Sequence, residues 1–185
     1  MHDVHPAIEE ALKAEDPEAS ILDVTPPVIR MSSGKDFYFK LGSPQDADQF
    51  LGEAEALKEM YIAAPGLAPR LVACATLDQA KLSSTIALDG GTPYFVSEYK
   101  HMGSLTDSAA RKLAKRLATE LHTYKSTHGF GFAVPTYCGN TRQENGWFET
   151  WEECYDSLIE GLVTKLENKG RFQELCEKTD LVRKR

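Results

Sequence analysis

The stretch KDFYFKLGSPQDADQFLGEAEALKEMYIAA, residues 35–64, decides the fold of this chain. Its first part, 35–42, alternates aromatic and polar residues and stops at a glycine, a pattern that predicts a β-strand. In the second part, Ser43 can cap a helix, Pro44 suits the first helical position, and acidic residues follow in the first turn. Apolar side chains then recur at helical spacing, at Phe50, Ala54, Leu57, Met60 and Tyr61. The sequence therefore predicts a strand followed directly by an amphipathic helix.

Two charges in this stretch are placed so that they can meet. Glu53 is three residues after Phe50 and four before Leu57, so we expect it on the apolar face of the helix. A carboxylate turned toward a core needs a partner, and Lys40 near the end of the strand is the nearest candidate. A strand lysine paired with a helix glutamate is the ion pair that protein kinases require around ATP. Spacing alone leaves open a second hypothesis, in which both charges are solvated on the surface.

The rest of the chain predicts an α+β fold. We expect helices over 5–14, 104–126 and from Thr150 to a stop at Gly170. We expect extended segments over 19–31, with a break at Pro26–Pro27. We expect a turn followed by a strand within 65–77, a strand over 93–99 and one weak strand at 85–91. This order predicts a small antiparallel sheet packed against one helix, followed by a helical segment.

The composition argues against several classes of protein. The chain has 185 residues, a formal net charge of -7 and no basic run, which makes it a poor candidate for binding nucleic acid. No stretch is apolar enough to span a membrane and the N-terminus does not resemble a signal peptide, so we expect a cytoplasmic protein. The four cysteines form no CxxC pair and no histidine lies at metal-ligand spacing from them, so we expect reduced thiols.

Both tryptophans fall within NGWFETWEECY, residues 145–155. Thr150 and Glu153 have the spacing of a capping box, which marks the start of a helix. Trp151 begins a helical apolar stripe, and this favours a buried position for it over an exposed aromatic platform for a ligand. The stripe continues through Cys154, Tyr155, Leu158, Ile159, Leu162 and Leu166. Trp147 precedes the cap and either packs against the start of the helix or lines a pocket.

Several of these stretches together resemble the fructosamine kinase family, also known as ketosamine-3-kinases or protein-ribulosamine 3-kinases, and its fungal branch in particular. They run in family order from about residue 36 to the end of the chain, and the run from 130 to 151 is the most specific. The stretches are FYFK, DQFLGEAEALK, APGLAPRL, PYFVSEY, LATELH, GFGFAVPTYCG and NGWFETWEECY. The resemblance implies a protein-kinase-like N-terminal lobe with a hinge over 1–100, and the first helices of an incomplete helical C-terminal lobe over 101–185.

The resemblance also implies an activity and a site. The family transfers a phosphoryl group from ATP, with Mg²⁺, to the 3-hydroxyl of a fructosamine or ribulosamine on a glycated lysine, which leads to deglycation. The expected partner is therefore a glycated protein or a small ketosamine. Lys40 resembles the lysine that positions the phosphates, and Glu53 resembles its helix partner. Ser97, Glu98 and Tyr99 resemble the hinge that binds adenine.

Two departures from the family pattern matter. The family has a His-Gly-Asp-type catalytic loop and a later magnesium-binding aspartate, but none of the five histidines here is followed two residues later by aspartate. We therefore expect no catalytic base, no metal ligands and no phosphoryl transfer by this chain alone, as in a chain truncated before the catalytic loop. The loop that would cover the phosphates is also poor, since it offers only Ser32, Ser33 and Gly34.

These departures leave a rival hypothesis. The chain can instead be a non-catalytic fragment that binds nucleotide or another protein. In that case it can self-associate through the exposed apolar face of the helix over 150–169, because an uncovered apolar face favours association.

Overall fold

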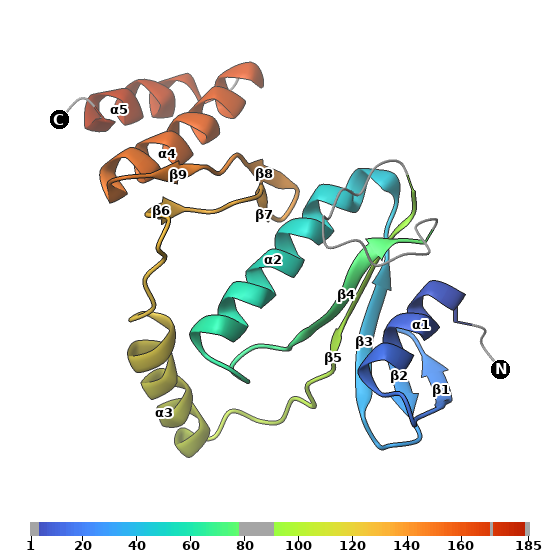
Figure 1. The fold of residues 1–185 in the computed structure, drawn as a ribbon. Coiled ribbons are helices and arrows are strands. Elements are labelled where there is room, and N and C mark those ends of the chain that lie inside the picture. Colours follow the sequence, from blue (N-terminus) through green and yellow to red (C-terminus); the bar gives the residue numbers. More distant parts are fainter. Residues whose placement is uncertain (1–3, 78–90, 171, 184–185) are drawn as a thin grey trace. The chain divides into compact units, whose positions relative to one another are not determined.

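The computed structural model describes residues 4–77, 91–170 and 172–183, and it divides into two units, residues 1–124 and 125–185. In the first unit, five antiparallel strands form a sheet in the order β1-β2-β3-β5-β4 (Figure 1). The strands are β1 Ile21–Thr25, β2 Val28–Met31, β3 Asp36–Leu41, β4 Leu71–Thr76 and β5 Pro93–Glu98. The helices are α1 Pro6–Glu15, α2 Ala47–Ala63 and α3 Asp107–Arg116. The predicted α+β class is confirmed.

The sheet of the first unit is covered on both faces. Because neighbouring residues of a strand point to opposite faces, β3 sends Phe37 and Phe39 to one side and Tyr38 to the other. Phe37 and Phe39 pack with the buried residues of α1, whereas Tyr38 packs with those of α2. The sequence predicted one covering helix, and the structure adds α1 on the opposite face (Figure 1).

Helix α2 is positioned by a capped turn and a narrow buried stripe. The 3₁₀ turn η1, Pro44–Asp46, precedes it. The buried residues that form the stripe are Ala47, Phe50, Ala54 and Leu57. The prediction that Glu53 lies on the buried face is wrong, since its side chain is 43% exposed at the border of this stripe. Tyr61, which we expected in the stripe, is 40% exposed, because it lies past the last buried turn.

The predicted helix over 104–126 is shorter and less regular in the structure. Thr106 caps α3 by accepting a hydrogen bond of 3.2 Å from the backbone N–H of Ala109. A π-helical turn, η2 Leu117–Leu121, continues α3. No residue of α3 or η2 is fully buried, although η2 contacts α2. The weak strand predicted at 85–91 lies, apart from Gly91, outside the described residues.

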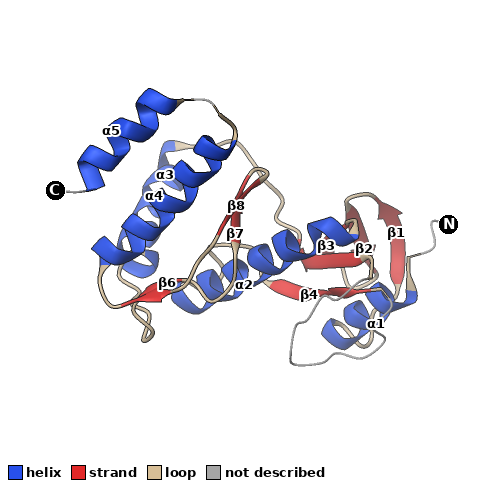
Figure 2. Ribbon diagram, turned by 90° about the horizontal axis from the view of Figure 1, so that it is seen from above, coloured by secondary structure: helices blue, strands red, loops and turns tan. Residues whose placement is uncertain are grey.

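The second unit contains two neighbouring helices and two small two-stranded sheets (Figure 2). Its elements are β6 Phe130–Gly131, β7 Thr136–Cys138, β8 Thr141–Gln143, β9 Trp147–Phe148, α4 Trp151–Asn168 and α5 Gln173–Arg183. Strand β6 pairs with β9, and β7 forms a hairpin with β8. Gly131, with φ 135°, lies so close to this pairing that an added Cβ would approach the carbonyl oxygen of Gly146 to 1.7 Å. None of the described helices of either unit is long and apolar enough to cross a membrane.

The start of α4 confirms one prediction and corrects another. The capping box is present, with Thr150 Oγ1 accepting from the N–H of Glu153 at 3.2 Å and Glu153 Oε2 accepting from the N–H of Thr150 at 3.1 Å. Trp151 is 58% exposed, however, so the prediction that it is buried is wrong. Its ring lies 6.3 Å from that of Phe130 on β6 and 5.7 Å from that of Tyr155 on α4, so the described residues cover it only in part. Helical spacing identified the stripe but could not show what covers it.

Candidate functional site

Lys40 and Glu53 form an ion pair that joins β3 to α2. Lys40 Nζ donates to Glu53 Oε2, as the spacing of the two residues suggested. The same ammonium lies 4.3 Å from the ring centroid of Phe50 on α2 and 5.0 Å from that of Phe95 on β5. A cation over the face of an aromatic ring is attracted to it electrostatically. The Lys40 side chain is 24% exposed, so its ammonium contacts one carboxylate and two rings and is also accessible to solvent.

A second carboxylate lies close to Lys40 at the start of the helical segment. Asp46 Oδ2 accepts hydrogen bonds from the backbone N–H of Ser43 at 2.7 Å and from its hydroxyl at 2.8 Å. These bonds lower the pKa of Asp46, and the positive charge of Lys40 lowers it further. Asp46 is therefore ionised at neutral pH, and Lys40 has two carboxylates in its surroundings.

The turn beside Lys40 is not the one that the sequence suggested. The turn Thr25–Val28 joins β1 to β2, and the backbone N–H of Phe39 donates to the carbonyl oxygen of Pro27 at 2.9 Å. The triplet Ser32–Gly34 instead joins β2 to β3, at the opposite end of β3. At the rise of a strand, Gly34 is ~20 Å along the chain from Lys40. The small residues Ser32, Ser33 and Gly34 are thus a hairpin turn and do not lie next to the lysine.

The structure separates the three residues that were predicted to form a hinge, Ser97, Glu98 and Tyr99. Ser97 is 3% exposed and pairs in register with Tyr38, so it belongs to the same sheet face as Lys40. Its hydroxyl donates to the carbonyl oxygen of Glu98 at 3.4 Å. Glu98 and Tyr99 line a pocket on the other side, where α1 covers the sheet.

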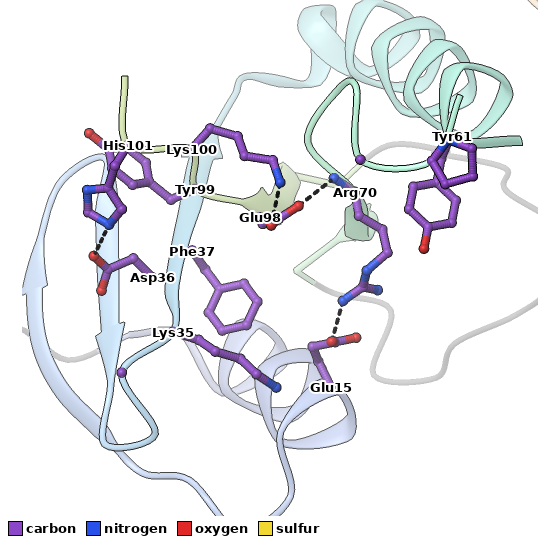
Figure 3. Close-up of a pocket in the computed structure, with 13 residues that line it drawn as sticks. Glu15, Lys35, Asp36, Phe37, Tyr61, Arg70, Glu98, Tyr99, Lys100 and His101 are labelled. Atoms are coloured by element: carbon purple, nitrogen blue, oxygen red, sulfur yellow. Dashed lines mark hydrogen bonds and ion pairs between the residues drawn. The ribbon is translucent and has the colours of Figure 1, made fainter. Parts of the chain in front are cut away.

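This pocket has a volume of about 620 Å³ and lies where β5 ends, next to Glu98 and Tyr99 (Figure 3). Aromatic and charged side chains face it from the end of α1, the start of β3, the end of α2 and the segment after it, and the end of β5 and the segment after it. Its labelled lining residues are Glu15, Lys35, Asp36, Phe37, Tyr61, Arg70, Glu98, Tyr99, Lys100 and His101. Lys40 and Glu53 are not among them, so the five site residues predicted from the sequence do not converge on one cavity.

The charges around the pocket are paired with one another. Arg70 pairs with Glu15, Lys100 with Glu98 at 2.6 Å, His101 with Asp36 at 3.0 Å, and Lys35 with Asp16 at 3.3 Å. Partial burial opposes ionisation of Glu98, but hydrogen bonds from Lys100 and from the backbone N–H of Arg70 outweigh it and lower its pKa. The hydrogen bond to Glu15 raises the pKa of Arg70. The acidic and basic side chains of the pocket wall are therefore arranged in pairs, and neither sign of charge is in large excess.

A protein-family model for fructosamine kinase matches residues 14–182. The chain belongs to the fructosamine kinase family. A crystal structure of a candidate fructosamine-3-kinase from Haemophilus somnus 129PT aligns with this family member at a TM-score of 0.61 and 15% sequence identity. The alignment covers 88% of this chain and 54% of that chain, so this chain spans about half the length of the bacterial protein. At this identity the likeness shows a shared kinase-like fold. No curated protein sequence matches this chain significantly.

The structure of this fructosamine kinase family member shows further residues at the candidate site that were not predicted from the sequence. The rings of Phe50 and Phe95 make cation–π contacts with the ammonium of Lys40. In the sequence these two residues are ordinary core positions of a helix and a strand. Arg70 and Glu15 join α1 to the segment before β4, although 55 residues separate them, and no local pattern predicts such a contact. Among the described residues, no group of three or more His, Cys, Asp or Glu side chains is arranged to hold a metal ion.

Proposed function

We propose that this chain is the nucleotide-binding part of a ketosamine-3-kinase. The observation that carries the proposal is the Lys40–Glu53 ion pair between β3 and α2, which is the arrangement that kinases use to place a lysine on the phosphates of ATP. In this proposal Glu53 orients Lys40, Lys40 contacts the nucleotide phosphates, and the backbone of Ser97, Glu98 and Tyr99 binds adenine. The fold and the family support it.

The reaction of the whole enzyme would pass the γ-phosphoryl group of ATP to the 3-hydroxyl of a ketosamine on a glycated protein or a small amine. ATP bound with Mg²⁺ supplies the phosphoryl group and the neutralising charge for such a transfer. The described residues include a lysine for the phosphates but no carboxylate cluster for the metal. The sequence also has no His-Gly-Asp-type motif to supply a base for the hydroxyl proton. We therefore propose that this chain alone binds nucleotide without transferring phosphate.

Nucleotide titration with matched variants tests the proposal. Ligand that binds only the folded state raises the unfolding temperature, so ATP with magnesium should stabilise the wild-type chain. Lys40→Ala should abolish that stabilisation. Lys58→Ala is the control, because Lys58 is also on α2 and pairs with Glu55 at 2.5 Å but lies outside the proposed site. The proposal fails if the wild type shows no stabilisation, or if Lys40→Ala keeps it. Incubation with a ketosamine and ATP should release no ADP above the background.

A second function is favoured by the exposed aromatic side of the second unit. Three aromatic side chains on β6 and α4 are exposed there, by 45% for Phe130, 58% for Trp151 and 52% for Tyr155. The ring of Trp151 lies between the other two and is near both. We propose as the alternative that this side of the 150–169 helix binds a second copy of the chain. Sedimentation velocity over a range of concentrations should then show dimers that Trp151→Ser removes. A monomer at all concentrations would exclude this alternative.

A further inference from the structure

The turn between β1 and β2 is unusual as a neighbour of a phosphate-binding lysine. It consists of Thr25, Pro26, Pro27 and Val28, with Thr25 and Val28 opposite each other in the strand register. Proline has no backbone N–H. Both central positions of this turn therefore lack the hydrogen-bond donor that any other residue would provide.

The position of this turn follows from the strand register. Val28 pairs with Tyr38, and the carbonyl of Pro27 accepts from the N–H of Phe39, the residue before Lys40. In kinases the loop in this place covers the ATP phosphates, and successive backbone N–H groups in a loop form a cradle for an anion. Here the loop in the covering position presents two proline rings.

The side chains around the turn do not replace the missing donors. The hydroxyl of Thr25 donates to Asp23 Oδ2 at 2.9 Å, so its proton is already used and a carboxylate lies beside it. Lys40 is paired with Glu53, and it is close enough to Asp46 for its positive charge to lower the pKa of that carboxyl. Among the described residues, the side chains beside the turn and Lys40 are therefore carboxylates, which supply no hydrogen-bond donor to the further phosphates of ADP and ATP.

We propose that the site distinguishes nucleotides by the base and the first phosphate only, and that it binds AMP, ADP and ATP with equal affinity. This inference rests on the proposed nucleotide site. Lys40 reaches one phosphate, while the β and γ phosphates find no donor at the Pro26–Pro27 turn. A charge-assisted hydrogen bond to a phosphate changes affinity by on the order of tenfold or more, so each missing donor has a measurable consequence.

Calorimetric titration of the wild-type chain with adenosine, AMP, ADP and ATP, at one fixed magnesium concentration, tests this. We expect the three phosphorylated ligands to agree within about threefold, and adenosine to bind about tenfold more weakly because it offers nothing to Lys40. Lys40→Ala should bring AMP to the level of adenosine. If ATP binds at least about tenfold more tightly than AMP, the inference is wrong and the nucleotide site stands. If no ligand binds, the nucleotide site itself is wrong.

A variant that restores the donors tests the cause. The double substitution Pro26→Gly and Pro27→Gly adds two backbone N–H groups in the turn, and we expect it to bind ATP more tightly than AMP. Pro17→Gly adds a donor in an exposed turn away from this site and should leave the AMP-to-ATP ratio unchanged. A folded double variant with the wild-type ratio would show that the turn is not the cause. If circular dichroism shows that the double variant does not fold, the wild-type series alone decides.

Discussion

The contacts of Lys40 with the rings of Phe50 and Phe95 lead to a prediction about stability that does not depend on any ligand. Phe95 is 1% exposed and contacts the rings of Tyr38 and Phe50 edge-on, at 6.5 Å and 6.4 Å. Phe95→Leu keeps most of the apolar volume, so we expect a loss of about 1 kcal/mol for the reduced burial. Two lost ring pairs add about 0.5 kcal/mol each, which gives a total near 2 kcal/mol.

A double-mutant cycle isolates the contact between this ring and the lysine. Lys40→Met removes the charge and keeps the chain length, and combining it with Phe95→Leu gives the coupling free energy. With the ammonium 5.0 Å from the ring centroid and still partly solvated, we expect a favourable coupling of about 0.5–1 kcal/mol. The control cycle pairs Phe95→Leu with Lys58→Met, which should show no coupling, because Lys58 pairs with Glu55 instead.

Urea unfolding followed by far-UV circular dichroism is the appropriate assay. Both tryptophans belong to the unit of residues 125–185, so tryptophan fluorescence reports on that unit and not on the sheet that holds Phe95. A Lys40–Phe95 coupling indistinguishable from that of the Lys58 control would refute the placement of the ammonium over the ring. An unfavourable coupling would refute it as well.

Three further substitutions have defined outcomes. Burial raises the pKa of the Cys74 thiol from 9.0 to about 12, so the folded state favours the protonated thiol more than the unfolded state does. The resulting contribution to the free energy of unfolding is fully present at neutral pH and is lost as the pH rises from about 9 toward 12. Cys74→Ala should flatten that part of a stability–pH curve measured by urea unfolding. Thr150→Ala removes the cap whose oxygen accepts from Glu153, and it should cost the second unit about 1 kcal/mol by tryptophan-detected unfolding. Gly131→Ala should disrupt the second unit, because the added Cβ would meet the carbonyl oxygen of Gly146 at 1.7 Å. The tryptophan fluorescence transition of that unit should then be lost. Gly139→Ala is its control, with φ 57° but no atom within 4 Å, and should cost about 1 kcal/mol.

Much of the site could be predicted because its parts are local. The alternation in FYFK placed Phe37 and Phe39 on one face and Lys40 on the other, since side chains of a strand alternate. The Lys40–Glu53 pair followed from a strand and a helix joined by a short connection, and the structure contains it. The role of this pair and of Ser97, Glu98 and Tyr99 in binding nucleotide stays a prediction.

Other features depended on contacts between distant segments. The sequence suggested Ser32–Gly34 as the turn near the phosphates, but strand pairing placed the turn at Pro26–Pro27 beside Lys40 instead. The pocket next to Glu98 and Tyr99 is lined by Glu15 from α1 and Arg70 from beyond α2, and no periodicity relates these two residues.

The sequence by itself determined the family, the α+β class, the start of α4 at its capping box and the identity of the charged pair, because caps, alternation and motifs are written in neighbouring residues. Only the tertiary structure decided that Glu53 lies at the border of its helix stripe, that Trp151 is exposed and that prolines occupy the turn next to Lys40. The reason is physical. The spacing of residues shows which side chains share a face of a helix or strand, but what covers that face is set by the register and packing of segments far apart in the chain.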